Sequence, residues 1–455
     1  MCEGCRPTTE AALDHCVKGS PLATEAAPDH WVKGSPLVEL TRLRGFRDLF
    51  GADVRAMSLV EDRARELALR YNISEIRIPL LERIQLFARS TGETSDIVEK
   101  QMYAFTDRDE AETTVALRPE GTPSVVRAYV EAGLDRSDPE QRFFYSGPVF
   151  RRERPQKGRY RQFYQFGVEV FGRADPSCDA ELLAMVAELC RSLGLKVRFE
   201  INSIGDATCR PAFRAALIEW GRAHWDQLCD DCHNRIERNP LRLLDCKIDA
   251  KLAQSAPNSL DYLCDPCRAH FDTVKELATA SRIEFVVNPR LVRGLDYYTR
   301  TAFEVMAEGL GAQSTVVGGG RYDGLVEMMG GGAIPGIGFG IGVDRMALAL
   351  QAAGLVPTTA PDAAIIAMGP AATRQAVVVA QALRAADLSV EMLSPERRMK
   401  ALLGRASKIG ARFAVIIGDD ELARGVVQLR DLKNSSQREV AVADAAGAIA
   451  SAGKN

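Results

Sequence analysis

Apolar side chains follow helix-like or strand-like spacing in separate segments of this chain. Residues 53–71 repeat apolar positions at helical spacing and predict an amphipathic helix. Residues 143–145 and 163–171 are rich in aromatic and β-branched side chains and predict two strands on either side of a charged segment. Residues 76–81 predict a strand interrupted by proline, and residues 283–287 predict a further strand. These elements predict a domain that combines helices with a sheet.

The last part of the chain alternates between the two kinds of element. Residues 362–368 and 413–417 are apolar runs that predict buried strands, whereas residues 371–386 and 397–409 predict amphipathic helices. A stretch rich in proline and threonine at 356–361 predicts a linker before them. The alternation predicts a separate α/β domain, so the fold class is that of an α/β multidomain protein.

Two further segments depart from this pattern. Residues 9–22 recur, with two changes, as residues 24–37. Two copies are too few for a solenoid, so residues 1–38 predict a flexible extension. Residues 206–281 are rich in His, Cys, Asp and Arg and poor in β-branched side chains, and they predict an insertion.

The composition is that of a globular protein larger than one ordinary domain. At 455 residues, with 46% hydrophobic and 26% charged residues, the chain predicts two or three domains. No apolar run reaches the length of a membrane span, and the net charge of -3 argues against broad nucleic-acid affinity. An RNA partner would therefore contact local basic patches. Eleven cysteines without a secretory leader predict a reducing compartment, by default the cytoplasm.

The segment between the two aromatic strands carries the strongest charge pattern. Between residues 151 and 161 lie six cations and one acid, with a proline and a glycine that favour a turn. Arginine binds phosphate bidentately and stays protonated, so such a hairpin suits a polyphosphate or an RNA end. A solvated, charge-rich hairpin explains the spacing equally well.

Polar residues at fixed spacings add candidate binding groups. Glu120 and Thr122 are expected on a strand-to-helix turn, where a carboxylate and a hydroxyl can hold an ammonium group. We also expect Thr122 to cap the following helix. Gln165 and Glu169 stand four residues apart on the second aromatic strand, which places both on one face.

Two later segments contain arginine, tyrosine and glycine. The run at 291–299 reads Leu-Val-Arg-Gly-Leu-Asp-Tyr-Tyr-Thr, and glycine-rich runs occupy 318–324 and 336–345. Glycine lets the backbone approach a ligand closely, but such runs often mark only turns and tight packing. No Walker-type lysine loop and no dinucleotide fingerprint accompany them.

Taken together and in this order, these segments resemble the class II aminoacyl-tRNA synthetases in the form typical of the histidyl-tRNA synthetase family. The basic hairpin resembles motif 2, residues 336–345 resemble motif 3, and the run at 291–299 is typical of the histidyl enzymes. The resemblance extends from about residue 40 to residue 442. It implies an antiparallel-sheet catalytic domain at 39–205 and 282–355, a helical insertion at 206–281 and an anticodon-binding domain at 362–455.

The resemblance also implies an activity. Histidine and ATP would form histidyl-adenylate, with Mg²⁺ neutralising the phosphates, and histidine would pass to the histidine tRNA on a homodimeric enzyme. The implied residues are Arg293 and Arg151 for catalysis; Glu120, Thr122, Gln165, Glu169, Tyr298 and Tyr322 for histidine; Arg151, Glu153, Phe163 and Arg345 for ATP; and Arg159 and Arg161 for the tRNA acceptor end.

Two Cys-x-x-Cys pairs lie in the insertion. Cys229 and Cys232 precede Cys264 and Cys267, with Cys246 between the pairs. Four thiolates in two such pairs fit a tetrahedral structural zinc ion, although the spacing is longer than in simple zinc ribbons. Reduced, packed thiols are the alternative.

Two non-enzymatic functions also deserve consideration. A regulatory subunit that partners an ATP phosphoribosyltransferase has a related fold, but it usually lacks the anticodon domain and loses the 291–299 pattern, both of which this chain keeps. A module that senses uncharged tRNA would normally be fused to a kinase, and no kinase motif is present.

Overall fold

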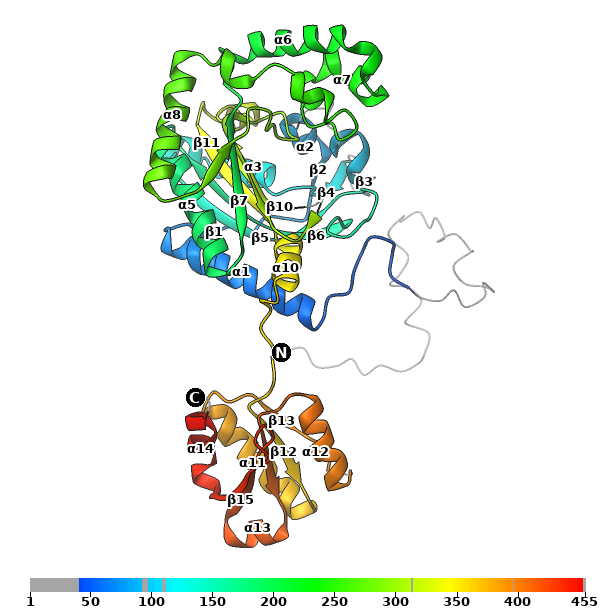
Figure 1. Ribbon diagram of the computed structural model, residues 1–455, viewed down its shortest axis with the longest axis vertical. Helices are drawn as coiled ribbons and strands as arrows, with labels where there is room; N and C mark the ends of the chain where they lie inside the picture. Colours follow the sequence, from blue (N-terminus) through cyan, green and yellow to red (C-terminus); the bar gives the residue numbers. More distant parts are fainter. Residues whose placement is uncertain (1–40, 92–96, 109–111, 312–313, 396, 453–455) are drawn as a thin grey trace, which may run out of the picture.

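The computed structural model describes residues 41–452, except for residues 92–96, 109–111, 312–313 and 396 (Figure 1). The predicted extension at 1–38 and its repeat lie outside the described residues. Among the described residues, no helix is long and apolar enough to cross a membrane.

An eight-stranded sheet forms the centre of the larger domain (Figure 1). It is antiparallel except at its two edges, where β1 pairs with β5 and β7 pairs with β8 in parallel. The predicted antiparallel-rich α/β fold is therefore confirmed. In spatial order the strands are β1 (Ser74–Glu75), β5 (Arg142–Phe150), β6 (Gln162–Phe171), β11 (Gly336–Gly342), β10 (Thr315–Arg321), β9 (Thr299–Ala307), β7 (Val197–Ser203) and β8 (Phe285–Val287).

Four helices share a hydrophobic core with one face of this sheet. The predicted helix at 53–71 is confirmed, and it buries Ala56, Val60, Ala64 and Leu67 because their spacing of three to four residues forms a single stripe. Alternate residues of the strands complete the core from the sheet side. The helices are α1 (Ala52–Arg70), α5 (Pro176–Ser192), α8 (Asp265–Ala280) and α10 (Val343–Ala352).

The opposite face of the sheet carries a second core and the binding pocket described below. A small antiparallel sheet flanks it, with β4 between β2 and β3. The elements on this side are β2 (Leu81–Arg83), α2 (Ile84–Thr91), a π-helix (Ile97–Gln101), β3 (Tyr103–Thr106), β4 (Thr114–Leu117), α3 (Thr122–Glu131), α4 (Leu134–Ser137) and α9 (Leu325–Met328).

The strand predicted at 76–81 is wrong in its extent. Residues 76–80 lie between β1 and β2, which belong to different sheets. Pro79 has no amide hydrogen to donate to a strand ladder, so the chain leaves one sheet before it and enters the other after it. By contrast, the predicted basic hairpin is confirmed as β5 and β6.

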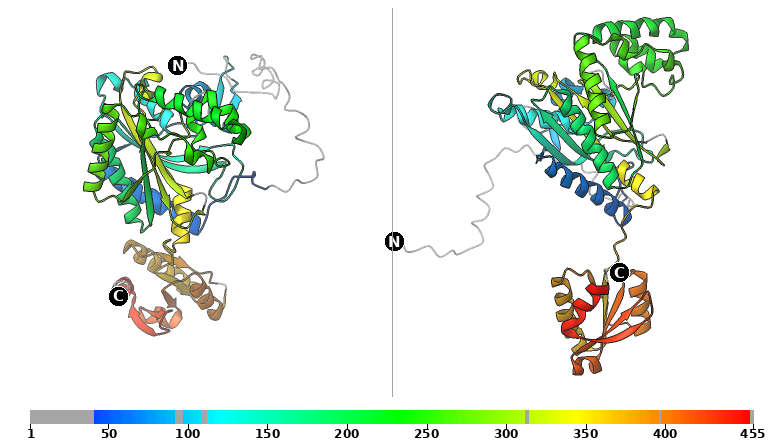
Figure 2. Two further views of the ribbon diagram at one scale, coloured as in Figure 1. Left: turned by 45° about the horizontal axis from the view of Figure 1, so that its top comes forward. Right: turned by 60° about the vertical axis from the view of Figure 1, so that its left-hand side comes forward.

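The segment predicted as a helical insertion connects β7 to β8 and forms a helical layer at one end of the sheet domain (Figure 2). The inner face of α8 buries Phe271, Val274 and Ala278 in the core of the large sheet, so this helix packs with the sheet domain. The other elements are α6 (Arg210–Ala223), α7 (Asp230–Arg238) and four short 3₁₀ turns (Trp225–Gln227, Pro240–Leu243, Leu252–Ser255 and Ser259–Tyr262).

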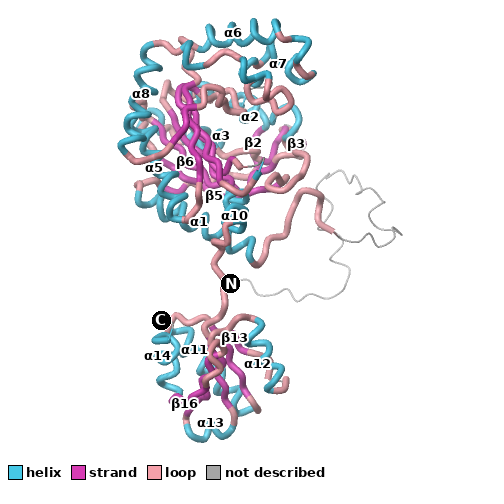
Figure 3. Tube along the Cα trace, in the orientation of Figure 1, coloured by secondary structure: helices cyan, strands magenta, loops and turns pink. Residues whose placement is uncertain are grey.

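The C-terminal part forms a separate five-stranded sheet with its own helices, after residues 355–361, which are neither helix nor strand (Figure 3). Every residue of β12 and β14 is buried, as expected for strands covered on both faces. In spatial order the strands are β13 (Val390–Met392), β12 (Ala363–Ala367), β14 (Phe413–Ile417), β15 (Val426–Asp431) and β16 (Gln437–Ala441). The helices are α11 (Pro370–Ala385), α12 (Met399–Lys408), α13 (Asp419–Arg424), a 3₁₀ turn (Val442–Asp444) and α14 (Ala445–Ala452).

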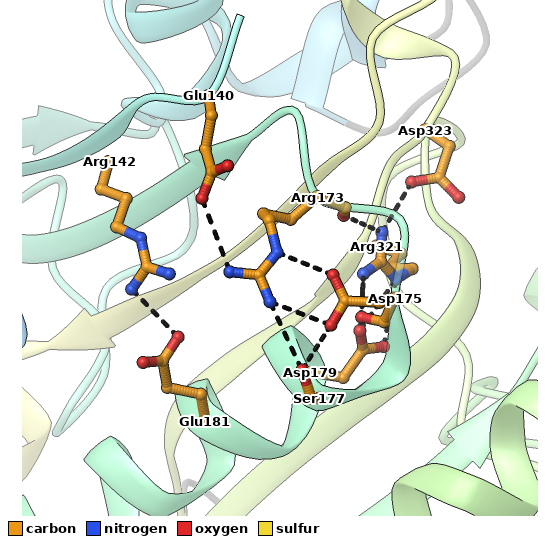
Figure 4. A network of polar contacts seen from close by, with 9 residues as sticks. All are labelled: Glu140, Arg142, Arg173, Asp175, Ser177, Asp179, Glu181, Arg321 and Asp323. Carbon is orange, nitrogen blue, oxygen red and sulfur yellow. Dashed lines mark hydrogen bonds and ion pairs between the residues drawn. The ribbon is translucent and has the colours of Figure 1, made fainter.

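A buried ion pair joins β10 to α5 (Figure 4). Arg321 and Asp179 both have 0% of their side chains exposed, and Arg321 Nε and Nη2 lie 2.9 and 2.7 Å from Asp179 Oδ2. The remaining Arg321 donors bond Asp323 Oδ1 and the backbone oxygens of Arg173 and Asp175 at 2.9 to 3.1 Å. The guanidinium is therefore fully engaged, which a buried charge requires.

We expect R321M to destabilise the protein strongly. The substitution keeps the volume but leaves the Asp179 carboxylate buried with only His270 Nε2 beside it, at 3.1 Å. Breaking a buried pair in this way typically costs about 3–5 kcal/mol. Denaturant unfolding of the full chain measures the effect. R142A is the control, since the Arg142–Glu181 pair is more exposed and is expected to contribute no more than about 1 kcal/mol. Equal stability of the two variants would contradict the prediction.

Candidate active site

One pocket on the sheet domain collects most of the residues predicted from the sequence. Its walls come from the β4–α3 connection, the β5–β6 hairpin, the loop before β9, the strands β10 and β11, and the start of α10. The predicted residues that line it are Glu120, Thr122, Arg151, Glu153, Arg159, Phe163, Gln165, Arg293, Tyr298 and Arg345.

Glu120 presents an unused oxygen to this pocket. Its Oε2 accepts a hydrogen bond of 3.0 Å from the Tyr297 hydroxyl. Its Oε1 is buried and has no hydrogen-bond partner among the described residues. A buried carboxylate oxygen is costly to leave unpaired, so Oε1 is suited to accept hydrogen bonds from a cationic ligand.

Glu169 and Tyr322 lie directly behind the lining instead of in it. Thr122 Oγ1 donates to Glu169 Oε1 at 2.6 Å, and the Tyr322 hydroxyl donates to Glu169 Oε2. Thr122 therefore does not cap α3, and that prediction is wrong: the helix starts after Gly121 with no side-chain cap. Gly338 of the neighbouring strand makes room, because a Cβ there would overlap Glu169 Oε2.

Gln165 lies on the same face of β6 as Glu169, as its spacing predicted. Its Oε1 accepts a hydrogen bond of 3.2 Å from the Tyr145 hydroxyl, and a Cβ at Gly340 would overlap its Nε2. Tyr145 and Gly340 thus fix the amide between two strands with its donor end at the pocket.

The cations on the opposite side of the pocket are held by backbone oxygens. Arg151 Nε donates to Pro119 O at 2.9 Å, and its guanidinium lies 5.5 Å from the centre of the Phe163 ring. Arg151 and Phe163 thus line the pocket side by side.

Arg345 is the second of these cations. It donates to Gly158 O at 2.9 Å and to Thr315 O at 3.1 Å. Gly158 has φ 75°, a backbone conformation that favours glycine and that turns the hairpin back toward α10. Burial lowers the pKa of Arg345, and the nearby Arg159 and Arg151 lower it further. Three guanidiniums this close favour a multiply charged anion among them.

Arg293 completes the positive wall from the loop before β9. It forms an ion pair with Glu304 of β9, while its Nε is buried without a hydrogen-bond partner in the described part of the chain. Gly318 of β10 leaves space for the guanidinium, because a Cβ there would overlap it. The pocket thus places an acidic and amide end beside a strongly cationic end.

Comparisons with known proteins identify the family. The sequence model of the histidyl-tRNA synthetase family matches residues 45–207 and 239–346, and that of the anticodon binding domain matches residues 362–452. The histidine–tRNA ligase of Desulforamulus reducens is 46% identical over 407 residues, which cover 88% of this chain and 97% of the relative. That of Anaeromyxobacter dehalogenans is 44% identical over 415 residues, which cover 90% of this chain and 100% of the relative. The chain belongs to the histidyl-tRNA synthetase family.

Solved structures agree with this family assignment, which confirms the resemblance found in the sequence. The apo histidyl-tRNA synthetase of S. aureus has a TM-score of 0.74 at 34% identity, covering 90% of this chain and 99% of that one. An ATP phosphoribosyltransferase regulatory subunit/histidyl-tRNA synthetase from Bacillus halodurans has a TM-score of 0.61 at 20% identity, which shows the shared fold alone.

The two arginines predicted to contact tRNA in this family member occupy different places. Arg159 lines the pocket, with its Nε 2.8 Å from Glu153 Oε2. Arg161 lies outside the lining and donates to the backbone oxygens of Glu153 and Arg44, both at 3.3 Å. The tRNA contacts of both residues stay predictions.

Several pocket residues were not found from the sequence. Tyr297 bonds Glu120, Tyr145 bonds Gln165 and Glu304 pairs with Arg293. Asp344 accepts from the Tyr164 amide at 2.6 Å. Tyr297 and Asp344 had a signal, since they lie next to Tyr298 and Arg345 in the runs at 291–299 and 336–345, whereas Tyr145 and Glu304 are recognised only from the tertiary structure.

The cysteines predicted to bind one zinc ion do not meet at one point. The first Cys-x-x-Cys pair and the second lie in two separate groups, each completed by another cysteine and an aspartate. The prediction of a single zinc site formed by both pairs is therefore wrong, because the fold brings a different third cysteine and a different aspartate to each pair. The groups are Cys229, Cys232, Cys246 and Asp249, and Asp206, Cys209, Cys264 and Cys267.

Both buried glutamates have raised pKa values. Burial raises the pKa of Glu120 to about 7, while Arg151 and the Tyr297 hydroxyl oppose the rise. Burial raises the pKa of Glu169 to about 8, against the hydrogen bonds from Thr122 and Tyr322. The negative charge of the nearby Glu120 carboxylate also raises the pKa of Glu169.

These pKa values predict that the ligand-free protein loses stability as the pH rises from about 5 to about 8. An unfolded glutamate ionises near pH 4.3, so in this window the folded state binds more protons than the unfolded state. Each group then lowers the free energy of unfolding by up to about 1.4 kcal/mol per pH unit. Glu169→Gln cannot ionise, so its melting temperature is expected to exceed that of the wild type at pH 8.5 but not at pH 5.5.

Glu327→Gln is the control, because Glu327 is exposed on α9 and its replacement is expected to leave the pH profile unchanged. Identical pH profiles for the wild type and Glu169→Gln would refute the raised pKa of Glu169.

Proposed function

We propose that this protein attaches L-histidine to histidine tRNA through a histidyl-adenylate intermediate, using ATP. The observation that supports this most is the pairing, in one pocket, of the unused Glu120 oxygen with the cationic wall of Arg151, Arg293 and Arg345. An amino acid needs a carboxylate for its ammonium group, and ATP needs cations for its phosphates. The pocket offers both within one cavity.

Histidine occupies the acidic end in this proposal. Glu120 accepts hydrogen bonds from the α-ammonium group, helped by the hydroxyl of Thr122 and the amide of Gln165. The imidazole lies against Tyr298, with Glu169 and Tyr322 forming the polar floor beneath it. A neutral imidazole has one donor and one acceptor, so a wall with both kinds of partner distinguishes it from apolar side chains.

ATP occupies the cationic end. Phe163 stacks on adenine, Glu153 contacts the adenine side, and Arg151 and Arg345 bind the α- and γ-phosphates. Mg²⁺ enters as part of the ATP substrate and takes phosphate oxygens and water as ligands. The nearby carboxylates of Glu153 and Asp344 are already engaged by arginine side chains, which agrees with a cation held mainly by the nucleotide.

Adenylate formation then needs little proton transfer. A histidine carboxylate oxygen attacks the α-phosphorus, and pyrophosphate leaves. Negative charge builds up on the α-phosphate oxygens in the transition state, where Arg293 and Arg151 stabilise it. Glu304 holds the Arg293 guanidinium in position beforehand, so little reorganisation accompanies the reaction.

The same arrangement makes a purely regulatory role less favoured. A regulatory paralogue has no need of a complete arginine wall or of an anticodon-binding domain, and both are present here. In the proposed enzyme the hairpin residues Arg159 and Arg161 face the tRNA acceptor end, and the C-terminal domain contacts the anticodon.

We expect histidine alone, among the twenty amino acids, to support ATP–pyrophosphate exchange without tRNA. Arg293→Ala should lower the exchange rate about 100-fold or more, because it removes a preorganised charge at the α-phosphate. Arg152→Ala is the matched control: Arg152 is exposed beside Arg151 and lies outside the pocket lining. An unchanged rate in Arg293→Ala would contradict its assigned role, and no exchange with any amino acid would favour the regulatory paralogue.

We also propose that the protein is a homodimer. Large apolar side chains are exposed on the N-terminal half of the sheet domain, among them Leu43 at 72%, Phe50 at 77% and Leu69 at 63%. Burial of such side chains against a second copy would stabilise a dimer. Light scattering on the purified chain is expected to give about twice the chain mass of 49.7 kDa. A monomer mass across a wide concentration range would exclude the dimer.

A further inference from the structure

We propose that the helical insertion holds two structural zinc ions, each bound by three cysteine thiolates and one aspartate. In each group the four candidate ligand atoms lie within 4.8 Å of one another. This inference goes beyond the aminoacylation proposed above and does not depend on it, because it concerns residues outside the pocket.

The first group, Cys229, Cys232, Cys246 and Asp249, lies inside the insertion. Cys229 Sγ is 3.7 Å from Cys246 Sγ, and Cys246 Sγ is 3.6 Å from Asp249 Oδ2. On a tetrahedral zinc ion with Zn–S of about 2.3 Å and Zn–O of about 2.1 Å, two sulfurs lie about 3.8 Å apart and a sulfur and an oxygen about 3.6 Å apart. The observed separations match both values.

The second group, Asp206, Cys209, Cys264 and Cys267, joins the two ends of the insertion. Asp206 Oδ1 lies 3.7 Å from Cys209 Sγ and 4.0 Å from Cys264 Sγ. The Asp206 amide also donates to Cys209 Sγ at 3.3 Å, which ties the two residues together.

A salt bridge and a backbone hydrogen bond hold the aspartates in place. Asp206 Oδ2 pairs with Arg300 at 3.2 Å, so its Oδ1 is the oxygen that turns to the sulfurs. Asp249 Oδ2 accepts the Cys229 amide at 3.1 Å. Such contacts orient metal ligands and are typical of built metal sites.

The donor set selects the metal. Thiolates favour zinc over calcium and magnesium, which prefer oxygen ligands. Each group has three cysteines, and a disulfide would pair only two of them. A metal ion accounts for all three. On binding, each group releases the protons of its three thiols, and one arginine offsets part of the remaining negative charge at the second group.

The two sites would stabilise a region that has little regular structure of its own. The first links the start of α7 to the turn after Pro240–Leu243, and the second links the start of α6 to the start of α8. Between α7 and α8 the only regular elements of the chain are short 3₁₀ turns. Cross-links of this kind supply the folding energy that a small core lacks.

Metal analysis of the full-length protein, purified without chelators, tests the proposal. We expect about two zinc ions per chain, falling to about one in Cys232→Ser and about one in Cys267→Ser, and to none in the double variant. Cys190→Ala is the control: Cys190 is buried in the sheet core, belongs to neither group, and should leave the zinc content unchanged.

X-ray absorption at the zinc edge of the wild type is the second measurement, and it decides the proposal even where a variant fails to fold. Three sulfur ligands and one oxygen ligand per zinc are expected. Less than about 0.2 zinc per chain would show that the thiols are simply reduced and packed, and would overturn the proposal. One zinc per chain, or a shell of four sulfurs, would also overturn it.

Discussion

The ion pair between Arg321 and Asp179 is the contact on which the arrangement of the pocket depends. Two charges without solvent exposure are stable only if every donor and acceptor is engaged, which leaves one position for each side chain. Arg321 ends β10, so its fixed position also fixes the next residue, Tyr322, against Glu169. Asp179 of α5 also forms a hydrogen bond with His270 of α8, so the same carboxylate helps to fix the position of α8 against α5. A charged contact outside the pocket lining thereby fixes the residues beneath the pocket.

Space inside the pocket is created by glycines of the two central strands. Side chains at Gly338, Gly340 and Gly318 would overlap Glu169, Gln165 and Arg293 respectively. The glycine-rich runs therefore serve mainly to leave volume for polar side chains from neighbouring strands, and only secondarily to bend the chain. This explains why a sheet, normally packed with apolar side chains, can hold two carboxyl groups and an amide next to each other.

The helical insertion directly supports the loop before β9. Asn239 Nδ2 donates to Asp296 Oδ1 at 2.6 Å, and Arg210 Nη1 donates to Tyr298 O at 2.8 Å. Both acceptors belong to the loop that carries Arg293, which has no helix or strand of its own. The order of the insertion is therefore coupled to the position of Arg293, and the two cysteine groups lie in the part of the chain that provides this support.

Local pattern predicted many of the helices and strands, and the resemblance to a known family supplied most of the candidate site residues. Apolar spacing predicted α1, the β5–β6 hairpin and the strands β12 and β14, because burial on one face or both faces leaves a direct mark on the sequence. The tertiary structure alone decided which side chains meet. It placed Glu169 behind Thr122, brought Glu304 to Arg293, and gave each cysteine pair a different third cysteine. These contacts depend on a strand order that is not sequential and on the path of the insertion, and no local periodicity records such pairings.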